Sequence, residues 1–102
     1  MIILMGNIDV TPADREAFLA DARILAQTVR AEPGCLFHSL APDSAPDGPM
    51  VLAQRWQDQA ALDRHMARAS TLTFREKWLG RVKMDVTAYS ASSALINVRI
   101  FR

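Results

Sequence analysis

The chain has 102 residues, a length that fits a single domain, so we expect one domain over residues 1–102. Half of the residues are hydrophobic and 23% are charged, which is typical of globular proteins and excludes a disordered or fibrous chain. Twelve Lys and Arg residues and eleven Asp and Glu residues give a net charge of +1, and the basic residues are scattered. This distribution argues against nucleic acid or a membrane surface as a partner and favours a neutral or small organic ligand.

The cysteine content and the first ten residues bear on metal sites and localisation. Cys35 is the only cysteine, which excludes an intrachain disulfide and the zinc sites that need paired Cys ligands. We therefore expect no metal ion and a reducing, cytoplasmic environment. Residues 1–10 are apolar, but Asn7 and Asp9 interrupt them and no basic leader precedes them. This pattern predicts neither a signal peptide nor a membrane anchor.

The first half of the chain predicts a strand, a helix and a second strand. Residues 1–9 are rich in Ile, Leu and Met and indicate a mostly buried strand. Thr11 and Pro12 form a helix start, and the helix is expected over residues 13–31. Its apolar stripe consists of Phe18, Ala22, Leu25 and Val29. Pro33 and Gly34 end the helix, and the alternation over residues 35–41 is that of a strand.

The second half repeats this order. Residues 42–49 are rich in Pro, Asp and Gly and indicate a hairpin loop, after which residues 50–57 alternate as a strand. Asp58 can cap a helix over residues 59–68, and Ser70 or Thr71 can cap a further helical turn or two that ends near Gly80. Residues 84–89 and 94–101 indicate two last strands, or one long strand broken between them.

The order strand, helix, strand, strand, helix, strand predicts an α+β fold of the ferredoxin-like, split βαβ type. In that fold an antiparallel sheet carries the helices on one face. Both faces of the expected sheet are largely apolar, and the C-terminal strand lacks a partner within the chain. Because a bare apolar face and an open sheet edge are unfavourable in water, we expect a homodimer that packs sheet against sheet.

Two segments give the chain a resemblance to a known family. Residues 32–36 read EPGCL, and residues 56–65 read WQDQAALDRH. With these segments in this order, the chain resembles the antibiotic biosynthesis monooxygenase family, which consists of dimeric α/β barrels related to quinol monooxygenases and haem-degrading monooxygenases. The resemblance covers nearly the whole chain. It implies a dimeric α/β barrel and oxygenase chemistry without flavin, haem or metal.

Some positions depart from the family pattern. Many relatives carry Glu where this chain has Gln54, and a second His where it has Ser70. Tyr is common at the position of His38. The haem-degrading branch uses an Asn, a Trp and a late His, but Trp78 stands at the place of that His. The resemblance therefore argues against haem binding.

The family chemistry requires a base for the substrate. An electron-rich phenol or enol is deprotonated, and its anion passes an electron to O2, so the resemblance implies an aromatic polyketide-like or quinol substrate. His65 is the first candidate for the base, because an imidazole titrates near neutral pH and the family has His at this position. His38 is the second. An exposed helical His65 and a structural core His38 are the alternative interpretations.

Further residues are candidates for binding the small apolar or aromatic substrate. Asn7 and Trp56 match the family pattern, and we expect them to line one elongated pocket without touching. Trp78 and Phe74 are candidates for its apolar wall, and Tyr89 for a donor to a phenolate. Ordinary core packing is the alternative for each aromatic residue.

Two other functions remain open at this point. The same base can move a proton on a small carbonyl compound, which would make the protein an isomerase. The loss of the Glu and of the second His also leaves open a dimer that binds an apolar ligand without catalysis.

Overall fold

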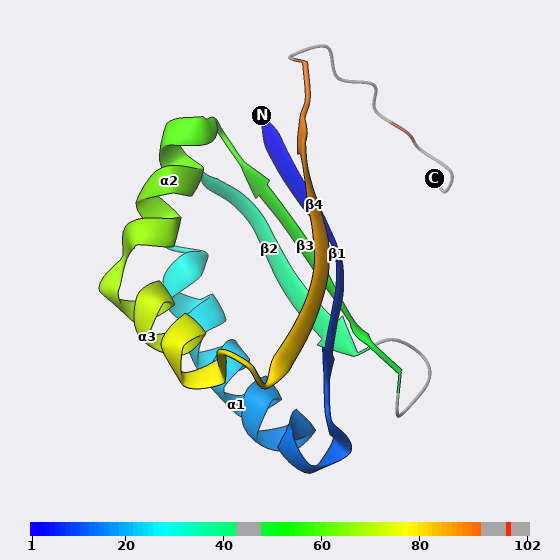
Figure 1. Cartoon of the computed structure of the whole chain (residues 1–102). Coiled ribbons are helices and arrows are strands. Elements are labelled where there is room, and N and C mark those ends of the chain that lie inside the picture. Colours follow the sequence, from blue (N-terminus) through cyan, green and yellow to red (C-terminus); the bar gives the residue numbers. More distant parts are fainter. Residues whose placement is uncertain (43–47, 93–97, 99–102) are drawn as a thin grey trace.

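The structure is a computed structural model that describes residues 1–42, 48–92 and 98. Its elements are β1 (Ile2–Val10), α1 (Pro12–Val29), β2 (Cys35–Pro42), β3 (Met50–Trp56), α2 (Gln59–Ala67), α3 (Ala69–Trp78) and β4 (Val82–Ser90). The strands form one antiparallel sheet in the order β2-β3-β1-β4, and the helices lie together on one of its faces (Figure 1). This arrangement confirms the predicted α+β, ferredoxin-like fold. The sheet-to-sheet dimer remains a prediction.

The register of β1 decides which side chains face the helices. Ile2 pairs with Trp56 and Ile8 with Met50, and all four side chains are buried between the sheet and the helices. Met5 points the other way and is exposed. Side chains alternate between the faces of a strand. The odd-numbered residues of β1 therefore lie on the helix-free face.

The core between sheet and helices has two parts. The first cluster of buried residues, near the C-terminal end of β1, consists of Ile8, Val10, Phe18, Ala22, Met50, Leu52 and Trp78. The second, near the N-terminal end of β1, consists of Ile2, Val29, Trp56, Ala61 and Leu62. The predicted helical stripe contributes to both clusters, so α1 spans the length of the core.

Several predicted boundaries differ from the structure. Helix α3 begins at Ala69 and runs for ten residues, so it is longer than the predicted turn or two. Ser70 and Thr71 lie inside its first turn, and the expectation that one of them caps the helix is wrong. Arg68 adopts an extended backbone (φ −66°, ψ 143°) between α2 and α3, which interrupts the helical hydrogen bonds there.

At the C-terminus, β4 starts two residues earlier than predicted, at Val82. The strand predicted over residues 94–101 lies outside the described residues, apart from residue 98. None of the described helices is long and apolar enough to cross a bilayer.

Candidate functional site

A cavity of about 230 Å³ lies between the sheet and the helices, and we call it the inter-layer cavity. Its wall is mostly apolar and includes Ile8, Phe18, Leu40, Leu52, Phe74 and Val86. The polar side chains at the cavity are His38, Gln54, His65, Thr71 and Arg75. An apolar cavity with a few polar groups is the usual form of a small-molecule site.

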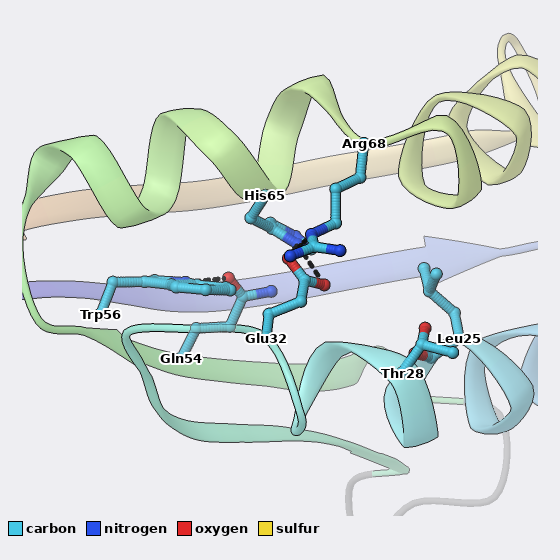
Figure 2. A network of polar contacts seen from close by, with 7 residues as sticks. All are labelled: Leu25, Thr28, Glu32, Gln54, Trp56, His65 and Arg68. Carbon is cyan, nitrogen blue, oxygen red and sulfur yellow. Dashed lines mark hydrogen bonds and ion pairs between the residues drawn. The ribbon is translucent and has the colours of Figure 1, made fainter.

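A buried ion-pair network holds His65 at this cavity. His65 Nδ1 lies 3.1 Å and 3.2 Å from the two carboxylate oxygens of Glu32, and Arg68 Nε lies 3.0 Å from Oε1 of the same group (Figure 2). Both His65 and Glu32 are buried, whereas Arg68 is partly exposed. Because a carboxylate only accepts hydrogen bonds, His65 donates through Nδ1–H, and its Nε2 carries the free lone pair when the ring is neutral.

Local structure explains how two residues 33 positions apart meet. Asp58 accepts a hydrogen bond from the Ala61 amide at 2.8 Å and so fixes the start of α2, two turns before His65. Gly34 has a positive φ of 82° in the turn after α1, and a Cβ at this position would lie only 2.5 Å from Ala61 Cβ. A glycine therefore lets the turn pack directly on α2, which brings Glu32 beneath His65.

Trp56 supports the network from the sheet. Its ring stacks on His65 with centroids 4.7 Å apart, and its Nε1–H donates to Gln54 Oε1 at 2.9 Å. The indole N–H therefore already has an acceptor within the protein. Trp56 orients His65 and Gln54, and the Gln54 amide nitrogen is left as a donor at the cavity (Figure 2).

The structure brings together three of the sequence-predicted site residues: His65, His38 and Phe74 all line the inter-layer cavity. Burial lowers the pKa of His38, and the charges of Arg30 and His65 lower it further, against a weaker opposite effect of Glu32. His38 is therefore neutral near pH 7.

Asn7 and Tyr89 do not lie at the inter-layer cavity. Asn7 pairs with Val51 and Tyr89 with Ile3, and these positions belong to the helix-free face of the sheet. Both Asn7 and Tyr89 are exposed. The expectation that Asn7 and Trp56 line one pocket of the chain is wrong, because the two side chains leave opposite faces of the sheet.

Trp78 belongs to the core rather than to the cavity wall. Its ring packs edge-on against Phe18 at a centroid distance of 5.2 Å, and its Nε1–H donates to Asp21 Oδ2 at 3.1 Å. The cavity wall on this side is formed by Phe18 and Phe74 instead. Trp78 thus fills the space behind them.

Three residues of the site, Glu32, Gln54 and Thr71, are not among the predicted site residues. The sequence indicates Glu32 only as part of a turn and Gln54 only as the loss of a carboxylate, although the alternation along β3 places Gln54 on the same face as Trp56. At Thr71 the sequence predicts a helix cap. Its inward position follows from its spacing of three residues before Phe74, which is one turn of helix.

Residues 1–42, 48–92 and 98 contain no group of three or more His, Cys, Asp and Glu side chains placed to hold a metal ion.

Comparisons with known sequences show which family this chain resembles. The family model for antibiotic biosynthesis monooxygenase matches residues 1–77. The Bacillus subtilis protein named "Putative monooxygenase YcnE" is 37% identical over 65 residues, which are 64% of this chain and 68% of that protein. An uncharacterized protein of Synechocystis is 34% identical over 76 residues, which are 74% of this chain. The match covers 52% of the Synechocystis protein, so this chain spans about half of its length.

Solved structures have the same fold. PA3566 from Pseudomonas aeruginosa is 31% identical, with a TM-score of 0.73 and coverage of 88% of this chain and 94% of that one. A structure from Deinococcus radiodurans has a TM-score of 0.85 and covers 97% of this chain and 99% of that one, and at 24% identity it shows the fold alone. Taken with the family model, these similarities show that the chain belongs to the antibiotic biosynthesis monooxygenase family.

Proposed function

We propose that this protein is a cofactor-independent monooxygenase that oxidises a small phenol or quinol with O2 in the inter-layer cavity. The observation that carries the proposal is the geometry of His65. One ring nitrogen is held by the buried Glu32, and the ring lies against an apolar cavity. A positioned imidazole with one free lone pair is suited to remove a proton from a bound hydroxyl group.

The proposed reaction starts with proton transfer from the substrate to His65 Nε2. The resulting anion gives one electron to O2, the two radicals combine, and a C–O bond forms to give a hydroperoxide. The O–O bond then breaks with loss of water, so that one oxygen atom stays on the substrate carbon and the other leaves as water. The substrate supplies all four electrons, and Glu32 stabilises the imidazolium while His65 holds the proton.

Oxygen consumption with hydroquinone as substrate tests this function. We expect O2 uptake matched by the formation of a hydroxylated quinone, without added flavin or metal. Entry of solvent deuterium into a carbonyl substrate without O2 uptake would overturn the proposal in favour of an isomerase. Saturable quenching of Trp fluorescence without any turnover would overturn it in favour of a binding protein.

We further propose that two chains associate through their helix-free sheet faces. Met5, Val51 and Tyr89 expose apolar surface there, and a large exposed apolar surface usually marks an interface. Light scattering at micromolar concentration should give twice the mass of the chain, and Met5→Glu should lower it towards the monomer. A monomer mass for the unaltered protein would contradict the dimer.

We also propose a reducing, cytoplasmic location, because Cys35 is the single cysteine of the chain and no intrachain disulfide can form.

Cys35 itself is not expected to react. Burial is the main cause that raises the pKa of its thiol. A thiol with a raised pKa reacts slowly, so Cys35 has no catalytic part in the proposed reaction.

A further inference from the structure

Two buried polar atoms at the inter-layer cavity have no hydrogen-bond partner among the described residues. They are Thr71 Oγ1, on the first turn of α3, and His38 Nδ1, on β2. Thr71 is only 4% exposed, and both residues line the cavity. Because buried polar atoms are nearly always paired, each unpaired atom here indicates a group that the protein alone does not supply.

Two neighbouring polar atoms at the cavity already have partners within the protein. Gln54 Oε1 accepts from Trp56, and His65 Nδ1 donates to Glu32. Thr71 and His38 stand outside both contacts. The Thr71 hydroxyl both donates and accepts, and a neutral imidazole also offers one donor and one acceptor. A hydroxyl or carbonyl oxygen of a ligand can therefore pair with either atom.

The size of the cavity limits the ligand. A dry protein cavity of about 150 Å³ is large enough to hold benzene, and the inter-layer cavity measures about 230 Å³. The difference leaves room for a few oxygen atoms or a short substituent on one ring. A three-ring compound has more than twice the carbon atoms of benzene and needs about 300 Å³ or more by the same standard.

We propose that Thr71 and His38 determine substrate specificity, because Thr71 Oγ1 and His38 Nδ1 bind a second oxygen substituent of a single-ring aromatic substrate whose first oxygen faces His65. The inference rests on the proposed function in one respect, since it places the reacting hydroxyl at His65. It favours a single-ring substrate over large polycyclic ones at this cavity. It also assigns Thr71 a part in binding, a role that the sequence did not predict.

Anaerobic binding of two probes tests the inference without any turnover. Hydroquinone carries two hydroxyl groups and phenol carries one, and calorimetric titration under argon measures both affinities. We expect the unaltered protein to bind hydroquinone about fivefold to tenfold more tightly than phenol, which is the usual gain from one additional hydrogen bond. Equal affinities would overturn the proposed second oxygen site.

Three variants test whether Thr71 discriminates between hydroquinone and phenol. Thr71→Val removes the hydroxyl at nearly constant volume, and it should lower the affinity for hydroquinone about fivefold to tenfold while leaving that for phenol unchanged. Thr71→Ser keeps a hydroxyl and should restore the preference. Thr73→Val, an exposed position on the same helix, is the matched control and should change neither affinity. An unchanged preference in Thr71→Val would show that water alone satisfies Thr71 and would overturn its assignment.

His38 is tested by His38→Phe with the same two probes. We expect a weaker preference for hydroquinone and unchanged binding of phenol, and equal loss for both probes would overturn the assignment. These outcomes are separable from the proposed function. Thr71-dependent binding without O2 uptake would contradict the oxygenase alone, and O2 uptake with Thr71-independent binding would contradict the specificity site alone.

Discussion

The two buried tryptophans lie at opposite ends of the core and use their indole N–H groups differently. Trp78 donates to Asp21, a partly exposed carboxylate that also binds Lys77 Nζ at 2.6 Å, and its contacts join α3 to α1 near water. Trp56 donates to the buried, neutral Gln54 and stacks on His65. The same residue type therefore closes the core at one end and orders the polar groups of a cavity at the other.

The difference between the ends follows from burial. At the Trp78 end, the hydrogen bond from Lys77 is the main cause that lowers the pKa of Asp21, and that surface pair contributes little to stability. At the Trp56 end, Glu32 is buried, so each of its hydrogen-bond partners contributes more to stability. We expect substitutions at the Trp56 end to change activity and stability more than matched substitutions at the Trp78 end.

The largest expected effect is on catalysis. If the protein is an oxygenase, His65→Ala should lower kcat by about 100-fold or more, because the substrate loses its general base. Trp78→Phe, at the other end of the core, should leave kcat within about twofold. Steady-state O2 uptake measures both. Substrate that is already ionised at high pH should recover much of the His65→Ala loss. Full turnover of His65→Ala at neutral pH would contradict His65 as the base and leave His38 as the candidate, which His38→Ala tests.

The next largest effect is on stability and compares the carboxylates of Glu32 and Asp21. Glu32→Ala should lower the free energy of unfolding by about 2 kcal/mol, because His65 loses its buried partner. Arg68 is half exposed and can turn to water, which prevents a larger loss. Asp21→Ala should cost less, and its effect should shrink further in high salt. Urea denaturation at low and high salt measures these differences, and equal losses would contradict the comparison.

The tryptophans themselves offer a smaller and more direct test. Trp56→Phe leaves Gln54 Oε1 buried without its donor and should destabilise the protein by about 1 kcal/mol more than Trp78→Phe, whose acceptor Asp21 reaches water and Lys77. Adding Gln54→Leu to Trp56→Phe should recover part of the loss, because no unpaired oxygen remains. A double variant that is less stable than Trp56→Phe alone would count against this role of Gln54.

The smallest effect is the pH dependence that His38 contributes. Because its pKa is lowered in the folded protein, mainly by burial and then by Arg30 and His65, the unfolded chain binds the His38 proton first as the pH falls. The contribution of His38 to the free energy of unfolding is therefore complete above about pH 6.5, the ordinary pKa of His. This contribution is lost as the pH falls towards the lower pKa of His38 in the folded protein. Urea denaturation at pH 7.5 and 5.5 should show a smaller loss for His38→Gln than for the unaltered protein, and parallel losses would contradict this.

Local patterns were enough to predict much of the fold. The stripe from Phe18 to Val29 has the period of a helix, and its residues pack on the sheet as α1. The alternation of residues 50–57 predicts a strand, and β3 forms there with Met50 and Trp56 buried on the same face. These predictions succeed because helix and strand periodicity is a property of neighbouring residues, and the apolar side of each element can face only the core.

The candidate site depended on the tertiary structure. Ile3 and Met5 are as apolar as Ile2 and Leu4, so β1 alone does not indicate which face receives the helices. The expected shared pocket of Asn7 and Trp56 fails for that reason. Glu32 and His65 meet only because the turn at Gly34 packs on α2. The order of the elements from β1 to β4 and the family could be predicted without the structure, because both depend on short-range patterns and motifs. The packing of the helices on the sheet decided which polar groups share the cavity, because those contacts join residues that are distant along the chain.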